Sequence, residues 1–375
     1  MSPPGHEWIS SRAELERAAR RWAGAPALAI DTEFVFERTY RPRLGLVQIG
    51  DQGGVALVDP VALGDLEPLA GLLVSPAVEK VVHAGAADVY VLQRAAGAAP
   101  RPVFDTQVAA AFAGLGSALS YGALMRELFG VELSKHETRT DWLRRPLRQE
   151  QIRYAVEDVE RLLEAASELK RRLGELGRIE WAHEDSTRLT AAEEVEPESA
   201  WHRVRGIGRL PPAARRVARA LAAWREREAE RQDLARPFLL RDETLLALAR
   251  RAELTAKDAT KLPGYEPRRH AAHVEAWSAA LAEARERAAR ASDEDEPRKL
   301  TNAEIEAREI LDEKLAAAVA ARAEELALAP ELLLSRRQRQ RLIAHWDGSS
   351  PISAHLEGFR KELLGPTLDA AATAG

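Results

Sequence analysis

Two carboxylates stand two residues apart at the end of an apolar stretch near the N-terminus. The stretch covers residues 27–34 and places Asp31 and Glu33 directly after Ala27-Leu-Ala-Ile30. A β-strand sends residues i and i+2 to the same face, so both carboxylates point to one place. Like charges that close repel unless a cation lies between them, and hard divalent cations prefer carboxylate oxygen. The pair therefore predicts a metal site, and the alternative is a polar strand end in water.

Three more side chains could complete such a site. Asp88 falls at the start of a predicted helix over residues 86–96, where a carboxylate meets the positive end of the helix dipole. Tyr154 and Asp158 are four residues apart on a predicted helix over residues 148–172, and so share a face. Each also has a plainer interpretation: a charged helix start, a half-buried tyrosine and a surface aspartate.

The elements that must position these residues alternate between strands and helices. Strands are predicted at 27–34, 44–49, 55–59, 80–83 and 103–104, and helices at 11–22, 66–73, 86–96, 107–113 and 148–172. Asp51-Gln-Gly-Gly54 is a turn signal that predicts a hairpin. Pro146 and the polar residues before it predict a loop over residues 133–147. Three early strands followed by alternating strands and helices predict a mixed sheet flanked by helices.

Length and composition set the broad class. A chain of 375 residues predicts two or three domains, and 46% hydrophobic with 30% charged residues is typical of a soluble globular protein. No apolar run is long enough for a membrane span, and the start does not resemble a signal peptide. The absence of cysteine excludes disulfides and thiolate metal sites, and is consistent with a cytoplasmic protein.

Charge is distributed unevenly along the chain. The whole chain has a net charge of −5, yet residues 201–290 carry a net charge of +8. A basic segment beside acidic ones is typical of polyanion binding. The alternative is a helical spacer whose arginines pair with its own glutamates.

The order D-x-E, then D, then Y-x-x-x-D resembles the tyrosine-bearing branch of the DEDD exonuclease superfamily. Within it, the chain most resembles the bacterial ribonuclease D family over residues 25–172. The motifs are His83-Ala-Gly-Ala-Ala-Asp88, Phe104-Asp-Thr-Gln107, Arg139-Thr-Asp-Trp-Leu-Arg-Arg-Pro-Leu147 and Gln151-Ile-Arg-Tyr-Ala-Val-Glu-Asp-Val159. Several spaced motifs in one order are far more specific than any one alone.

The resemblance implies three domains. An α/β ribonuclease H-like exonuclease domain would cover residues 1–190, and an HRDC domain, a small all-α module that helps bind nucleic acid, residues 210–290. Residues 300–370 resemble a second, more diverged HRDC-like helical domain. Its acidic composition argues against direct RNA contact by that copy.

The resemblance also implies the reaction and its residues. The expected activity is hydrolysis of single nucleotides from an RNA 3′ end by two divalent metal ions, Mg²⁺ or Mn²⁺. Asp31, Glu33, Asp88 and Asp158 would hold the metals, and Tyr154 would position the attacking water. Expected substrates are tRNA precursors or other structured RNA with a 3′ tail, and the family precedent is a monomer without a membrane partner.

Other polar residues near the motifs have more than one interpretation. Four basic residues are candidate phosphate contacts, with solvated loop charge as the alternative: Lys135, Arg139, Arg144 and Arg145. We expect His83 to belong to the core, Asp105 to cap the helix that follows it, and Trp142 to pack.

Two other functions are compatible with the same scaffold. One is a catalytically silent RNA-binding protein, although all five active-site positions are intact. The other is a DNA-directed exonuclease of the superfamily. The proofreading branch carries His five residues before the last aspartate, and Arg153 stands there.

Overall fold

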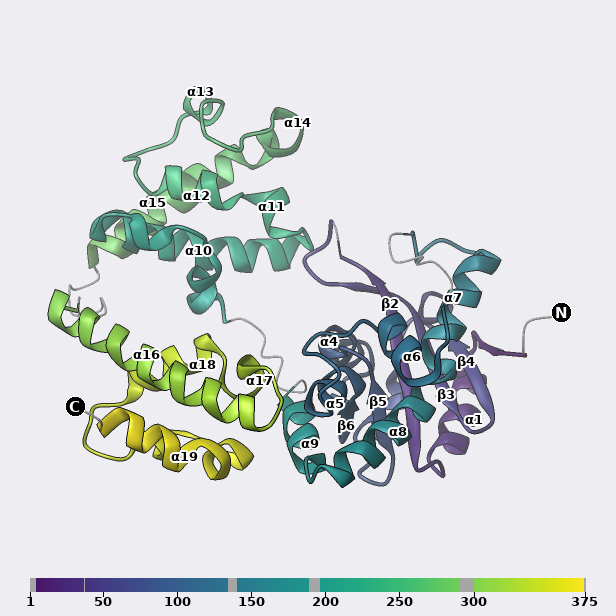
Figure 1. Ribbon diagram of the computed structural model, residues 1–375. Coiled ribbons are helices and arrows are strands. Elements are labelled where there is room, and N and C mark those ends of the chain that lie inside the picture. The colour runs from purple at the N-terminus through teal and green to yellow at the C-terminus, as the bar shows by residue number, and fades with distance from the viewer. Residues whose placement is uncertain (1–4, 37, 134–139, 189–195, 291–299, 374–375) are drawn as a thin grey trace. The chain divides into compact units, whose positions relative to one another are not determined.

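The chain forms a six-stranded mixed sheet (Figure 1), and one of its strands carries Asp31 and Glu33. Its strands are β1 (Glu7–Ile9), β2 (Ala27–Val35), β3 (Arg43–Asp51), β4 (Gly54–Val58), β5 (Glu79–Val82) and β6 (Val103–Asp105), in the order β1-β4-β3-β2-β5-β6. β3 and β4 are antiparallel, with Asp51 opposite Gly54, whereas β5 is parallel to both β2 and β6. The predicted hairpin and mixed sheet are confirmed, but β1, parallel to β4, was not predicted.

This computed structural model describes residues 5–36, 38–133, 140–188, 196–290 and 300–373. The chain divides into two units. Unit 1 contains residues 1–34, 44–192 and 300–375, and unit 2 contains residues 35–43 and 193–299. Among the described residues, no helix has both the length and the apolar character that crossing a membrane requires.

Helices cover both faces of the sheet. They are α1 (Arg12–Trp22), α2 (Pro60–Leu63), α3 (Ala70–Leu73), α4 (Ala86–Ala96), α5 (Thr106–Phe112), α6 (Tyr121–Phe129), α7 (Gln149–Glu160), α8 (Leu162–Glu175) and α9 (Ile179–Thr187). β2 alternates between two cores: Ala29 packs with residues of α5 and α8, whereas Leu28 and Ile30 pack with residues of α1 and α4. Asp31 continues the Ala29 face, because strand side chains alternate.

The predicted helix over residues 148–172 is two helices, which corrects the sequence interpretation. The break is at Arg161, whose φ of −111° and ψ of 5° leave the helical region. α7 packs against β4, and α8 packs against α5 and β5. No glycine or proline marks the break, so tertiary packing rather than local sequence ends α7.

The C-terminal helices belong to unit 1. They are α16 (Asn302–Glu325), α17 (Pro330–Leu334), α18 (Arg336–His345) and α19 (Gly358–Thr373), drawn in green and yellow in Figure 1. α19 packs on α9: the Phe359 ring stacks on Trp181 with centroids 5.2 Å apart, and Arg360 binds both carboxylate oxygens of Asp185 at 2.6 and 2.7 Å. The C-terminal helices therefore share a hydrophobic core with α5 and α8.

Unit 2 is a helical module with its own core. Its helices are α10 (Pro212–Gln232), α11 (Arg236–Leu239), α12 (Asp242–Leu248), α13 (Ala256–Ala259), α14 (Pro267–His270) and α15 (Val274–Arg290). Trp277 is fully buried among them and donates a hydrogen bond to the carbonyl of Leu239 at 3.1 Å. The segment that follows β2 also belongs to this unit, and Tyr40 packs against its core.

Candidate active site

Three carboxylates from β2 and α7 meet in one place. Asp31 and Glu33 lie on β2, and Asp158 lies on α7. One carboxylate oxygen from each side chain lies within 4.8 Å of the other two. All three side chains are half-buried. The i, i+2 prediction for β2 therefore holds, and the fold brings a residue 125 positions or more away to the same point.

Asp88 approaches the cluster from the first turn of α4 and is buried. Thr32, the residue between Asp31 and Glu33, donates a hydrogen bond to Asp88 Oδ1. The charge of Asp88 acts on both Asp31 and Glu33, raising the pKa of each carboxyl. The fourth predicted carboxylate is thus an electrostatic neighbour of the other three.

Asp105 shapes the turn that leads into α4. Its buried carboxylate caps α5 by accepting hydrogen bonds from the N–H groups of Gln107 and Val108. It also accepts hydrogen bonds from Ala84 N–H at 3.1 Å and Gly85 N–H at 2.8 Å, directly before α4. The predicted cap is confirmed, and the same carboxylate fixes the start of the Asp88 helix.

The electrostatics of the cluster favour the binding of a cation. Burial, followed by the charges of the other carboxylates, raises the pKa of Asp31 well above its ordinary value. The same causes raise the pKa of Glu33 to about 9. Burial also raises the pKa of Asp158 to about 7 and that of Asp88 to about 6. Such a site favours protons or divalent cations, because either relieves the repulsion.

Tyr154 lies on α7 one turn before Asp158 and hydrogen-bonds to it. Burial first, then the charges of Asp158, Glu33 and Asp31, raise the pKa of Tyr154. The phenol therefore stays neutral. Its ring packs against Trp142, with centroids 6.2 Å apart. Trp142 is itself buried and fits closely over Gly45, where an added Cβ would come within 2.6 Å of the Trp142 carbonyl oxygen. The expected packing role of Trp142 is confirmed.

His83 belongs to the structural framework, as expected. Its ring nitrogens lie 2.9 Å from Thr106 Oγ1 and 3.0 Å from the Leu119 carbonyl oxygen. Burial lowers its pKa. The imidazole therefore joins β5 to α5 and to the turn before α6.

The structure corrects the expected substrate role of Arg145. Its guanidinium donates to both carboxylate oxygens of Asp59 at 2.6 and 2.8 Å, and to the carbonyls of Gly45, Trp142 and Arg144. These five bonds use all five N–H donors of the side chain. Arg145 therefore fixes the loop before α7 onto the sheet, and none of its donors is left for a phosphate.

The structure does not contradict the other three candidate phosphate contacts. Arg144 is exposed to solvent. Lys135 and Arg139 lie outside the described residues. Arg144 thus keeps its place as a candidate phosphate contact.

Two residues near the cluster were not singled out from the sequence. The sequence does contain a signal for Thr32. Side chains alternate along a strand, so the hydroxyl inside D-x-E faces the opposite side from both acids and is available to a neighbouring element. Tyr121 lies on α6, a helix that was not predicted. Burial, followed by the charges of Asp158 and Asp31, raises its pKa.

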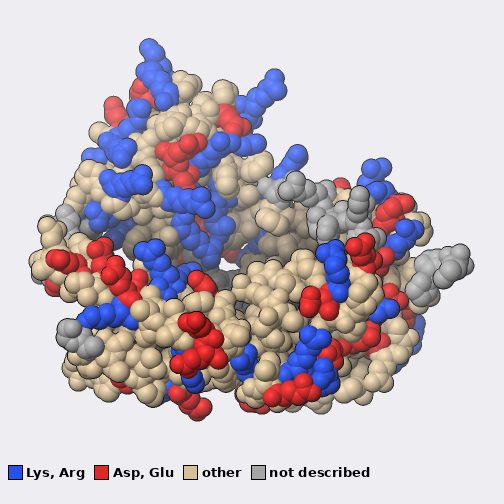
Figure 2. All heavy atoms as spheres, in the orientation of Figure 1, with Lys and Arg blue, Asp and Glu red and all other residues tan. Residues whose placement is uncertain are grey.

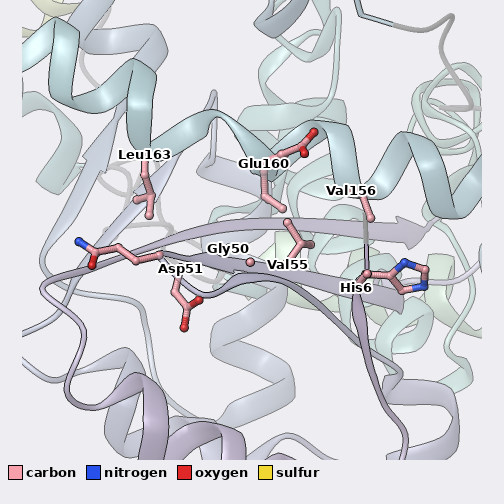
Figure 3. A pocket seen from close by; sticks show the side chains of 11 residues that line it. His6, Gly50, Asp51, Val55, Val156, Glu160 and Leu163 are labelled. Carbon is pink, nitrogen blue, oxygen red and sulfur yellow. The ribbon is translucent and has the colours of Figure 1, made fainter. Parts of the chain in front are cut away.

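A separate hollow lies beside α7 (Figure 3). Val156 and Leu163 face Val55 and Gly50 across it, and His6 closes one end. None of the residues that line it is one of the five predicted active-site residues. The acidic cluster, and not this hollow, is therefore the candidate site of chemistry.

Comparisons with known proteins assign the chain to a family. A family model described as 3′-5′ exonuclease matches residues 6–174, and an HRDC domain model matches residues 214–281. A ribonuclease D of Pseudomonas paraeruginosa is 37% identical over 372 residues, which cover 98% of each chain. The chain belongs to the ribonuclease D family.

Solved structures extend the ribonuclease D assignment to the fold. The crystal structure of Escherichia coli ribonuclease D, described as an exoribonuclease involved in structured RNA processing, matches with a TM-score of 0.86 and 31% identity. That match covers 98% of both chains. The catalytic core of RRP6 from Trypanosoma brucei, at 22% identity and a TM-score of 0.61, shares the fold over 75% of this chain. As a ribonuclease D, this chain is a 3′-5′ exoribonuclease.

Proposed function

We propose that this exoribonuclease removes nucleotides from RNA 3′ ends by a two-metal mechanism, with Asp31, Glu33, Asp88 and Asp158 as metal ligands. The observation that carries the proposal is the set of three carboxylate oxygens from β2 and α7 within 4.8 Å of one another. Oxygen-only donors suit Mg²⁺ or Mn²⁺. The raised pKa values of Asp31, Glu33, Asp88 and Asp158 support the fit, since a cation there would remove the mutual repulsion.

Each residue of the site then has a distinct role. When bound, two divalent cations neutralise charge on the scissile phosphate and acidify the attacking water. Asp31 and Glu33 would hold the metals from β2, a strand whose backbone is fixed by hydrogen bonds to its neighbours in the sheet. Tyr154 is neutral, so it orients the water by hydrogen bonding and is not the base that removes its proton.

We infer that the substrate is a structured RNA with a single-stranded 3′ tail, tRNA precursors included. The segment 201–290, which contains the HRDC domain, has a net charge of +8. Figure 2 shows Lys and Arg side chains gathered over the visible face of this unit. Cationic surfaces bind the RNA backbone without reading its sequence. The E. coli relative is itself described as acting in structured RNA processing.

We also propose that residues 1–190 and 210–290 are the exonuclease and HRDC domains, and that residues 300–370 are a diverged second HRDC copy. The net charge of −5 over residues 291–375 argues against phosphate contacts across that copy as a whole. The ion pair between Arg360 and Asp185, and the stacking of Phe359 on Trp181, support a structural role instead, in which this copy stabilises α9.

The test is digestion of 5′-labelled oligonucleotides, an RNA and a DNA of matched sequence, by the full chain. We expect the RNA to shorten from its 3′ end one nucleotide at a time, with release of nucleoside monophosphates, and EDTA to stop the reaction. Faster loss of the DNA would support a DNA-directed exonuclease. Binding of RNA without digestion in either Mg²⁺ or Mn²⁺ would support the catalytically silent protein.

A further inference from the structure

The strand that carries Asp31 and Glu33 runs directly into a segment that belongs to unit 2, here called the HRDC unit because it contains the HRDC match at residues 214–281. The chain passes from unit 1 to unit 2 between Phe34 and Val35, and returns between Arg43 and Leu44. Glu33 is therefore two residues from the point where the chain enters unit 2. The segment 35–43 also connects β2 to β3, its neighbour in the sheet.

A buried polar cluster anchors this segment within unit 2. Tyr40 donates its hydroxyl hydrogen to Glu226 Oε1 at 2.7 Å. Arg236 donates to both carboxylate oxygens of Glu226, and its guanidinium lies 4.7 Å from the centre of the Tyr40 ring. Glu226 is only 2% exposed. The hydroxyl and the guanidinium thus provide hydrogen-bond donors to a buried carboxylate, which would destabilise the fold if it were left without partners.

The ionisation states agree with this arrangement. Burial, followed by the hydrogen bond to Glu226, raises the pKa of Tyr40 to about 12. Burial opposes ionisation of Glu226, but the hydrogen bonds from Arg236 and Tyr40 lower its pKa overall. A neutral phenol and a guanidinium therefore both donate to a carboxylate, and such charge-assisted bonds are the stronger kind.

The backbone of the segment is held as well. The Ala235 N–H donates to the Arg38 carbonyl at 3.0 Å, and the Arg41 N–H donates to Asp233 Oδ1 at 3.3 Å. The Arg41 side chain also pairs with Glu230. Contacts on both sides of Tyr40 make the attachment a continuous interface and not a single bond.

We propose that Tyr40 and Glu226 are positioning residues for the exonuclease reaction, which fix the end of β2 and thereby the placement of Glu33. This inference rests on the proposed function, because it takes Asp31 and Glu33 as metal ligands. Displacement of a reacting group by about 1 Å can cost roughly 10²-fold in rate. The HRDC unit then contributes to the chemical step in addition to binding RNA.

The test compares Tyr40→Phe and Glu226→Gln with Tyr265→Phe in the full chain. Tyr265 is a matched control, because it is a tyrosine of the same unit whose ring packs edge-on against Trp277. The substrate is a trinucleotide RNA, which offers few phosphates for binding outside the active site. The readouts are kcat, KM, and Mn²⁺ affinity measured by electron paramagnetic resonance, below the melting temperature of every variant.

We expect Tyr40→Phe and Glu226→Gln to lower kcat by roughly two- to thirtyfold, typical of coupling through a packed network. Mn²⁺ affinity should fall with kcat while KM changes little, and Tyr265→Phe should match the wild type. The double variant should lose no more than the worse single variant, since both remove the same network. Wild-type kcat and Mn²⁺ affinity in both folded single variants would overturn the inference, as would independent, additive losses.

A further variant separates this inference from the proposed function. Asp31→Asn should lose both Mn²⁺ binding and hydrolysis, whatever the Tyr40 variants do. If it does, and the Tyr40 variants behave as wild type, only the positioning role fails. If Asp31→Asn binds Mn²⁺ and hydrolyses RNA normally, the proposed function fails first.

Discussion

The Thr32 hydroxyl donates a hydrogen bond to Asp88 Oδ1, so the residue between the two β2 acids ties that strand to the start of α4. Both side chains are buried. The bond lowers the pKa of Asp88, in opposition to the burial that raises it. It therefore keeps Asp88 closer to the ionised form that a metal ligand requires.

Thr32→Val keeps the shape of the side chain and removes the donor. We expect the pKa of Asp88 to rise above about 6, so that protons compete more strongly with the metal. Loss of a hydrogen bond to a charged group costs about 1.5–3 kcal/mol. The Mg²⁺ concentration that gives half-maximal rate should increase, and more at pH 6.5 than at pH 8. An unchanged Mg²⁺ requirement at both values would show that Thr32 serves only packing.

Tyr154→Phe keeps the ring that packs on Trp142 and deletes only the hydroxyl. If that hydroxyl positions the water, turnover should fall by roughly 10²- to 10⁴-fold. Binding of RNA, measured with the metal withheld, should barely change. A turnover number equal to that of the wild type would reduce Tyr154 to a packing residue.

Stability of the metal-free protein should depend on pH through the acidic cluster. Asp158 and Glu33 have folded-state pKa values of about 7 and about 9, above the ordinary values near 4 of the unfolded chain. Between the unfolded-state and folded-state pKa values of each group, the folded protein binds more protons than the unfolded chain. The contribution of these carboxyls to stability therefore falls as pH rises through that window. In EDTA, we expect the melting temperature of the wild type to fall between pH 5 and pH 9.

Asp158→Asn provides the control for that dependence. The substitution removes one of the repelling charges, so its metal-free melting temperature should exceed that of the wild type at pH 9. At pH 5 the difference should shrink, because Asp158 is protonated in the folded wild type. A difference that is the same at both values would contradict the electrostatic account of the cluster.

Local sequence patterns sufficed for much of the fold and the site. Apolar runs bounded by turn residues located β2, β3 and β4, and the i, i+2 spacing placed Asp31 beside Glu33. Only the ordered family motifs predicted that Asp158 belongs to the same site, because no local sequence pattern links residues so far apart. Asp105 was predictable as a cap, because an aspartate before a helix accepts from its first N–H groups.

What escaped prediction depends on tertiary contacts. The helix break at Arg161 carries no local signal, and the ion pair between Arg145 and Asp59 joins two segments that are 86 residues apart. Attachment of the segment 35–43 to α10 likewise joins residues as far apart as Tyr40 and Glu226. These features arise from packing between distant segments, which single-sequence patterns do not encode.

Exposed arginines of unit 2 that precede the HRDC domain should contribute to the salt dependence of RNA binding. Arg203, Arg205 and Arg209 are exposed on the described part of unit 2. Each phosphate contact contributes about 0.7 to 0.9 to the slope of log affinity against log salt. Replacing all three by Gln should weaken binding of a hairpin RNA with a 3′ tail and make that slope shallower. Binding is measured across salt concentrations with the metal withheld.

Arg227 and Arg231 provide a matched control, because each already pairs with a glutamate, Glu198 and Glu228 respectively. Replacing them by Gln also removes positive charge, but from side chains engaged with carboxylates. We expect a smaller change in slope for each arginine replaced. If the two sets have equal effects per arginine, binding reflects net charge and not a defined surface.

The most direct test of the metal site compares Asp158→Asn with Glu160→Gln, two charge-neutralising substitutions on α7. Asp158 lies in the acidic cluster, whereas Glu160 is exposed on the same helix. With Mn²⁺ binding and RNA hydrolysis measured on both, Asp158→Asn should lose metal affinity and several kcal/mol of transition-state stabilisation, while Glu160→Gln should match the wild type. Near-normal Mn²⁺ binding and turnover by a folded Asp158→Asn variant would contradict the account.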